Sequence, residues 1–242
     1  MRNVGAGVLL AAVMLLTSWQ TGLIASGADE TVDADTAAIR ELLEGTSGRR
    51  EMWATVPELV ILSSVMKYRA TDIQNGYIAT AETLTSAEIA ALTSDLSAAL
   101  SVLTGGRVSA FASVRVESIA PGETARVLRR GQVVVGRFDG VKATTGTLGF
   151  GGRTARNGAI TSAVVVLDRD FDRMSDQRRL LRTHELGHAL GYNHVESRRS
   201  VMNPRVGPEL TAFDRIAIER AFTDYPAPLN VPVAVQARAR QN

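Results

Sequence analysis

The most constraining feature of this 242-residue chain is the stretch HELGHALGYNH at residues 184–194, which holds all three of its histidines. Residues four apart share one face of a helix, with Cβ atoms about 5–6 Å apart, so His184 and His188 are predicted to point the same way. Gly191 follows, and glycine can take the left-handed conformation that ends a helix and turns the chain. The sequence therefore predicts a helix, a sharp turn at Gly191, and a return that brings His194 to the first two rings.

Three neutral imidazoles that converge leave one corner of a tetrahedron open, as in a catalytic zinc site. An all-imidazole set suits zinc, although copper or nickel could occupy the same ligands in vitro. A bare HExxH arises by chance in many proteins, but the longer pattern fixes five positions. We therefore assign His184, His188 and His194 as ligands of one Zn²⁺. Glu185, expected beside the metal rather than on it, is assigned as the general base that accepts a proton from zinc-bound water.

The apolar patterning of the rest of the chain predicts strands and helices in a definite order. A capping box at Thr85–Glu88 predicts the start of a helix, and Gly105-Gly106 predict its end. Gly-rich residues 144–152 are expected to form at best a short strand, near 147–150, within flexible loops. The helix that carries the histidines is expected to begin near Ser175. Strands are predicted at 59–68, 111–119, 132–138 and 159–167.

Three aspartates, Asp168, Asp170 and Asp172, resemble the start of a calcium-binding loop. The glycine and the closing glutamate that an EF-hand requires do not follow them. Turn formation and helix capping are therefore the better explanation. Calcium binding has no support beyond this partial likeness.

Residues 1–28 have the layout of a secretory signal peptide: a positive residue, an apolar run and then small residues up to Ala28. The run is short for a bilayer span of roughly 20 residues, but its extension would give an uncleaved membrane anchor. Either way, the protein is expected to be secreted or periplasmic. Residues 29–57 are polar and small, and they are expected to form a linker or pro-like segment with one short helical turn. Residues 226–242 are expected to be a C-terminal tail.

Composition excludes several classes of protein. The chain has no cysteine, so it has no disulfide, thiolate ligand or cysteine nucleophile. The net charge is only +2, and the arginine pairs are scattered without interleaved aromatic residues, so nucleic-acid binding is not expected. The length suits one domain with a substantial core, which we expect to be a monomer.

The pattern HExxHxxGxxH at 184–194 resembles the zinc signature of the metzincin metallopeptidases. Met202 follows within Ser200–Pro204, which resembles the methionine turn of the matrixin branch. Thr211 and Asp214 resemble the capping box of the matrixin C-terminal helix. The resemblance implies that Met202 lies beneath the metal without binding it, and that Asp214 braces this turn.

The resemblance covers roughly residues 58–225, and the fold that it implies agrees with the predicted order of elements. It implies an α+β fold: a metzincin-like catalytic domain with a twisted, mixed five-stranded sheet, a backing helix and an active-site helix. The strand near 147–150 would be the sheet edge that borders the cleft. Residues 195–206 would line the specificity pocket.

The chain also departs from the matrixins. Latency through a propeptide cysteine is excluded, and the further histidines that hold a second, structural zinc in many matrixins are absent. Val195 follows the third ligand, where serine is usual. Pro204 stands where other metzincin branches carry a metal-binding tyrosine, so no tyrosine ligand is expected.

The leading hypothesis is a secreted zinc-dependent endopeptidase that hydrolyses peptide bonds in a peptide or protein substrate. One alternative is a catalytically silent zinc-binding scaffold, but a structural zinc needs no base beside it, and Glu185 is present. The other alternative is a hydrolase of non-protein amide bonds, such as those of a cell wall. The sequence does not separate that activity from proteolysis.

Overall fold

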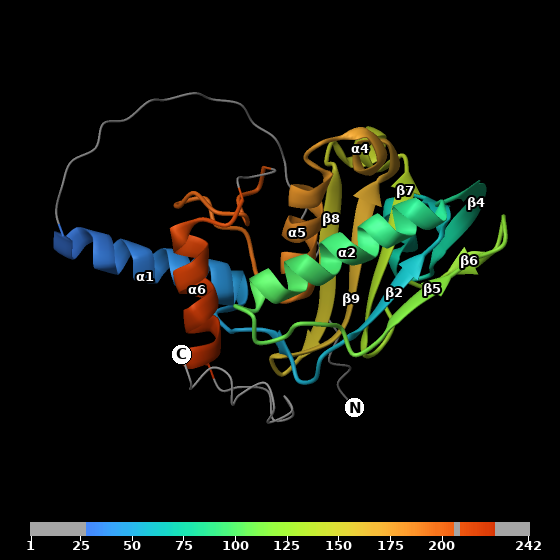
Figure 1. Cartoon of the computed structure of the whole chain (residues 1–242). Coiled ribbons are helices and arrows are strands. Elements are labelled where there is room, and N and C mark those ends of the chain that lie inside the picture. The colour runs from blue at the N-terminus through green and yellow to red at the C-terminus, as the bar shows by residue number, and fades with distance from the viewer. Residues whose placement is uncertain (1–27, 206–208, 226–242) are drawn as a thin grey trace.

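The computed structural model describes residues 28–205 and 209–225. They form a mixed α/β fold in which helices pack on a mixed, multi-strand sheet (Figure 1). The predicted signal peptide, apart from Ala28, and the predicted tail at 226–242 lie outside the described residues.

The centre of the sheet is parallel. β7 (Gln132–Asp139) lies between β9 (Ala159–Asp168) and the consecutive strands β2 (Glu58–Leu62) and β3 (Ser64–Lys67), all parallel to it. The single strand predicted at 59–68 is thus two strands, separated at Ser63.

The edges of the sheet are mixed. β8 (Gly149–Arg156) pairs antiparallel with β9, while β5 (Val114–Glu117) pairs parallel with β2 on the other side. β4 (Tyr77–Thr83) pairs antiparallel with β3 and also with β6 (Thr124–Ala125), and β1 (Met52–Trp53) adds to the start of β9. The order β8-β9-β7-β2-β5 contains every predicted strand. The sheet nevertheless has nine strands rather than the five expected.

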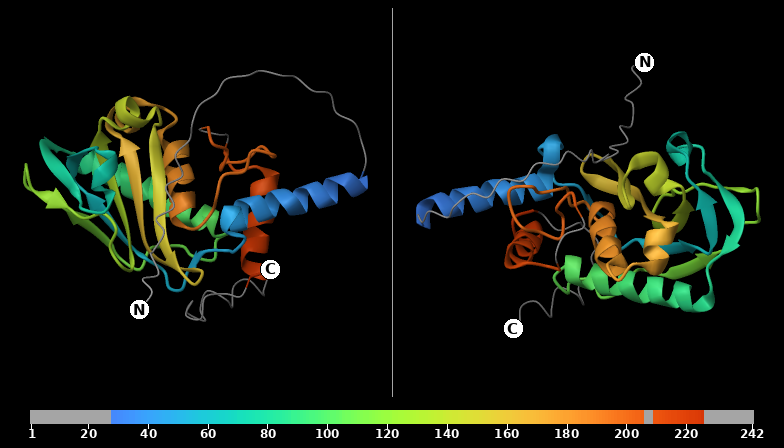
Figure 2. Two further views of the ribbon diagram at one scale, coloured as in Figure 1. Left: turned by 180° about the vertical axis from the view of Figure 1, so that it is seen from behind. Right: turned by 90° about the horizontal axis from the view of Figure 1, so that it is seen from above.

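Helices cover one face of this sheet. α2 (Ser86–Leu103) crosses that face, and α5 (Arg178–Ala189) packs against both α2 and β8 (Figures 1 and 2). α1 (Ala28–Glu44) and α6 (Ala212–Thr223) pack together beyond α5. The remaining helices are short: α3 (Val141–Thr145), α4 (Arg169–Met174), η1 (Gly45–Ser47) and η2 (Ala70–Ile73).

The central strands are buried on both faces, which explains their uninterrupted apolar sequences. Val133 and Val135 face the core beneath the helices. Their neighbour Val134 faces a second core that contains Tyr68 and Tyr77. Because successive side chains of a strand point to opposite faces, each valine run contributes to both cores.

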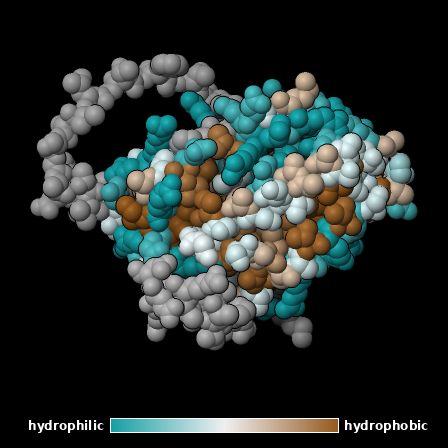
Figure 3. Space-filling model, viewed as in Figure 1, coloured by the Kyte–Doolittle hydropathy of each residue, from teal (hydrophilic) through white to brown (hydrophobic). Residues whose placement is uncertain are grey.

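The helix predicted from the capping box is confirmed. Thr85 accepts a hydrogen bond from the Glu88 backbone, and the Glu88 side chain bonds back to Thr85. α2 is long and apolar enough to cross a membrane by composition, but its apolar residues Leu92, Leu96 and Leu100 pack in the core. On the surface seen in Figure 3, apolar residues gather between α6 and α2 and along the lower side of α2.

The prediction of a linker with one helical turn at 29–57 is wrong in its local structure. The segment contains α1, a helix of 17 residues, followed by η1 and β1. Ala38, Ile39, Leu42 and Leu43 form a stripe on α1 that is no more than 4% exposed. A helix with so few apolar residues depends on tertiary burial, which local sequence does not reveal.

The prediction that the aspartates at 168–172 form a turn and cap a helix is confirmed for Asp168. The Asp168 carboxylate accepts a hydrogen bond from the Phe171 backbone and caps α4. Asp172 is fully buried between Arg137 and Arg182. The additional helix α4 occupies this segment, and α5 therefore begins at Arg178 rather than near Ser175.

Candidate metal centre

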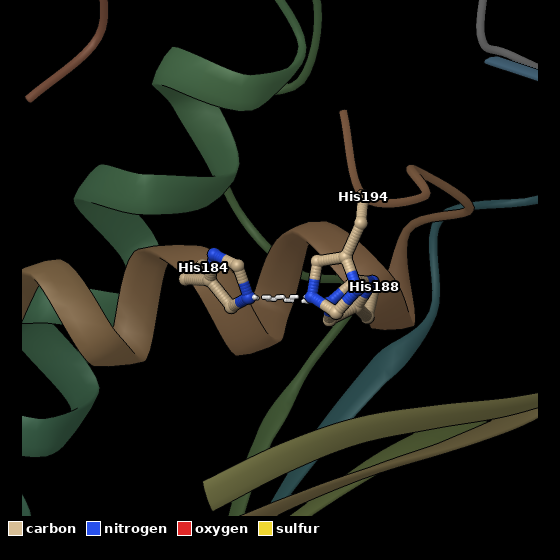
Figure 4. Close-up of side chains that lie close together, drawn as sticks. All are labelled: His184, His188 and His194. Carbon is tan, nitrogen blue, oxygen red and sulfur yellow. Dashed lines mark hydrogen bonds between the residues drawn. The ribbon is translucent and has the colours of Figure 1, made fainter. Parts of the chain in front are cut away.

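The three histidines lie together, as predicted. α5 presents His184 and His188 on one face, and the loop after it brings His194 against them (Figure 4). The Nε2 atoms are 3.2 Å apart for His184–His188, 3.2 Å for His184–His194 and 3.0 Å for His188–His194. Zinc bonds of about 2.0–2.1 Å in a tetrahedron separate nitrogen ligands by roughly 3.3 Å, so this cluster could hold such an ion.

The hydrogen bonds on the opposite ring nitrogens fix the tautomers of two histidines. His184 Nδ1 lies 2.7 Å from the Val201 carbonyl, and His188 Nδ1 lies 3.0 Å from the Tyr192 carbonyl. A carbonyl only accepts, so both Nδ1 atoms carry the proton and both Nε2 atoms are acceptors. Acceptor nitrogens that face one another at this distance repel unless a cation lies among them.

Burial keeps the three rings neutral. It lowers the pKa of His184 and, together with the neighbouring rings, lowers the pKa of His188 well below its usual value. Burial and the proximity of His184 lower the pKa of His194 to about 4. Neutral imidazole is the form that binds a metal, so the protein environment favours the ligand form.

The turn at Gly191 is confirmed. Its φ is +102°, and a Cβ atom there would lie 2.1 Å from the Glu51 carbonyl oxygen. Both the backbone conformation and the space available therefore require glycine. The Gly191 carbonyl accepts a hydrogen bond of 2.7 Å from the buried Arg50 guanidinium.

Two residues that the sequence did not reveal hold the loop between the second and third ligands. Asn193 donates to the Leu42 carbonyl at the end of α1 from both its backbone (2.8 Å) and its side chain (3.2 Å). Arg153 on β8 donates to the Asn193 side-chain oxygen (2.9 Å) and to the His188 carbonyl (3.0 Å). Arg153 lies in no local motif, and Asn193 occupies a variable position of the histidine pattern, so only their distant partners show what they do.

The segment after His194 lies directly against α5. The Met202 sulfur would be 2.4 Å from a Cβ atom at Gly187, between the two helical histidines, so this glycine makes room for the methionine. Asp214 accepts hydrogen bonds from Ser200 Oγ (2.5 Å) and the Val201 backbone (3.0 Å), as predicted. Since the Val201 carbonyl in turn holds the His184 ring, α6 supports His184 through Asp214.

Glu185 is a residue of α5, and its buried side chain lies against β8. Burial raises its pKa to about 8, against the opposing effect of a hydrogen bond from the Gly151 backbone. The strand approaches α5 closely at this point: a Cβ atom at Gly151 would be 2.2 Å from the Glu185 carbonyl oxygen and 2.6 Å from the His188 Cβ. Gly149 and Gly151 therefore serve close packing, and the expected flexible loop is the start of an eight-residue strand.

Comparison with models of protein families and with curated proteins gives no match to this chain. The structure thus supports a mixed α/β protein with a three-histidine cluster that could hold a metal ion. Among the described residues, no other group of histidines and carboxylates of this kind is found.

Proposed function

We propose that this protein is a zinc-dependent endopeptidase of the metzincin type, closest to the matrixin branch. The observation that carries the proposal is the convergence of three imidazole nitrogens, from His184, His188 and His194, on a helix that also carries the buried Glu185. A structural zinc site requires the nitrogens but not the carboxylate. The combination favours hydrolysis over a scaffold role.

The residues have separate roles in this proposal. The three histidines would hold one Zn²⁺, which when bound supplies a Lewis acid that polarises a carbonyl and acidifies water. Glu185 would accept the proton of the attacking water and pass it to the leaving amine. Met202 and Asp214 touch the ligand helix and its supporting loop, so they would position the ligands and take no part in proton transfer.

The edge strand β8 supports a peptide as the substrate. Among the described strands it pairs only with β9. The Leu148 carbonyl accepts a hydrogen bond from the backbone of Asp168, the last residue of β9. Because hydrogen-bonded and non-hydrogen-bonded pairs alternate along antiparallel strands, residues 149 and 151 direct their main-chain groups away from β9. An extended peptide could therefore add to this edge and pass directly beside His188. This mode of binding favours a peptide over other amides, although a hydrolase of cell-wall amides would use the same zinc and base.

Export of the protein is part of the proposal. The basis is the sequence at 1–28 alone, which has the layout of a signal peptide.

Digestion of a diverse peptide mixture tests the proposed activity. The purified protein, loaded with zinc, should produce new peptide termini that mass spectrometry identifies. Chelation should abolish them, and zinc should restore them. A zinc-loaded protein that binds peptides but yields no new termini would contradict the endopeptidase and favour the scaffold.

A further inference from the structure

α1 forms one wall of a cavity that contains two of the candidate ligands. The cavity has a volume of about 510 Å³, within the range of small-molecule and side-chain pockets. Its lining includes His188 and His194, Arg153 of β8 and residues of α1. A peptide on the edge of β8 that passes His188 would therefore meet α1.

The orientation of α1 is fixed by its buried face. Ala38, Ile39, Leu42 and Leu43 are buried in the core, as described above. Helical periodicity then turns the other face of α1 toward the cavity. The α1 residues on the cavity wall are Ala37, Arg40, Glu41 and Glu44.

The two carboxylates on this wall already have partners. Glu41 accepts hydrogen bonds from the Glu196 backbone (3.1 Å) and from Ser197 Oγ (3.0 Å), so both its oxygens are engaged. Glu44 accepts a hydrogen bond of 2.5 Å from the Tyr225 hydroxyl. These contacts hold α1 against the loop after the third ligand and against the end of α6.

The two arginines of the cavity differ in their partners. Arg153 is committed to Glu51 at 2.7 Å and to the ligand loop. Arg40 is exposed, and within the described part of the chain it forms no ion pair. Its guanidinium is therefore the charged group of this wall that remains available to a ligand.

We propose that this cavity is a substrate subsite that accepts an acidic side chain, with Arg40 as the residue that selects it. The proposal rests on the endopeptidase function proposed above and adds a substrate preference to it. A guanidinium binds a carboxylate through paired N–H donors, and an aspartate or glutamate next to the scissile bond would supply that carboxylate. Because His188 and His194 line the cavity together with Arg40, the preference applies to one fixed position relative to the cleaved bond.

Peptides that differ only in the placement of one glutamate test this proposal. The set carries glutamate, glutamine or lysine at each position near a common cleavage site. We expect glutamate to be favoured over lysine at one position, by roughly threefold to tenfold in kcat/KM, and the preference to weaken with salt. Arg40→Glu should reverse the preference at that position.

Arg130→Glu is the matched control, since it makes the same change of charge at an exposed arginine outside the cavity. It should retain the preference of the parent protein. Equal cleavage of all peptides by the parent, or identical behaviour of the two variants, would overturn the subsite while leaving the endopeptidase in place.

Binding separates the subsite from the catalytic proposal. Fluorescence anisotropy with labelled peptides on zinc-loaded Glu185→Gln protein measures the same charge preference without turnover. One possible result is that the parent protein cleaves nothing, yet binding prefers glutamate and Arg40→Glu reverses this preference. That result would support the subsite and contradict the endopeptidase. The absence of both binding and cleavage would contradict both proposals.

Discussion

His194 is the candidate ligand whose position depends most on the rest of the fold. His184 and His188 lie four residues apart on α5, so the helix alone sets their separation. His194 follows a turn, and its neighbour Asn193 is held by the Leu42 carbonyl of α1 and by Arg153 of β8. The position of His194 therefore depends on two distant elements, and one of them, α1, precedes it by more than a hundred residues.

Asn193→Ala should weaken zinc binding without removing a ligand. Loss of its side-chain hydrogen bonds to Leu42 and Arg153 loosens the loop that carries His194, while the backbone bond to Leu42 remains. Changes in residues that support ligands typically cost 10–100-fold in metal affinity. Competition with a chromophoric chelator measures this. His188→Ala should lose zinc at neutral pH, and the exposed Asn75→Ala should have no effect. Equal zinc affinity of Asn193→Ala and the parent would show that the loop does not need Asn193.

Met202 should shape the site without binding the ion, because thioether sulfur is a poor zinc ligand beside imidazole. Its side chain is 1% exposed and packs against Gly187. Met202→Leu nearly conserves volume and should lower the free energy of unfolding by less than about 1.5 kcal/mol, as urea denaturation would measure. X-ray absorption of the zinc-loaded protein should show no sulfur bonded to the metal, and a zinc–sulfur bond would refute this role.

At the scale of the elements, the contact between β8 and α5 determines the geometry of the site. Gly151 touches the backbone of Glu185 and the His188 side chain, so an added methyl group must push the strand from the helix. Gly151→Ala should cost about 1–3 kcal/mol of stability and reduce zinc affinity as well. Gly152→Ala is the control, because a Cβ atom there meets only a Val164 methyl group at 3.4 Å. Similar melting temperatures for the two variants would contradict the close contact.

The elements that the sequence predicts well are those with local signals. α2 has a capping box and α5 has the histidine spacing, and both were predicted close to their observed positions. The sequence does not predict α1, β4 and most of β8, because each depends on contacts with distant parts of the chain rather than on a local signal. The Tyr77–Thr83 sequence of β4 contains alanine and glutamate, which are weak strand formers, and it is a strand because it pairs with β3. The supporting residues Arg153 and Asn193 were missed because only the fold brings their partners near.

At the scale of the whole molecule, a network of ion pairs joins the sheet to three helices. Arg137 of β7 bonds to Asp172 of α4 and to Glu88 of α2, and Arg182 of α5 bonds to Asp172 and Asp95. Asp172 and both arginines are nearly inaccessible to solvent. Removal of one partner from such a network leaves a buried charge unpaired, so the network makes the packing of α5 depend on α2 and β7.

This network predicts a loss of stability in acid. Burial raises the pKa of Glu88, but hydrogen bonds from Thr85, Arg137 and Arg173 outweigh it and lower the pKa from 4.5 to about 2. Because the folded pKa is the lower one, ionised Glu88 stabilises the fold above pH 4.5, and this stabilisation is lost as the pH falls toward 2.

Urea denaturation in the presence of chelator, from pH 6 to pH 2, should show the effect. The parent should exceed Glu88→Gln in stability by on the order of 2 kcal/mol at pH 6, and the difference should shrink toward pH 2. A difference that is constant with pH would show that the Glu88 charge does not stabilise the fold.

The comparison of Glu185→Gln with the parent protein tests the central proposal most directly. Glutamine keeps the shape of the side chain and one acceptor oxygen, but its amide cannot accept the proton of the attacking water. The variant should therefore bind one zinc per chain as the parent does, while peptide cleavage falls by about 10²–10⁴-fold. Zinc content and cleavage rate are measured on the same preparations. Equal cleavage rates for two zinc-loaded proteins would contradict the assignment of Glu185 as the base, and with it the proposed mechanism.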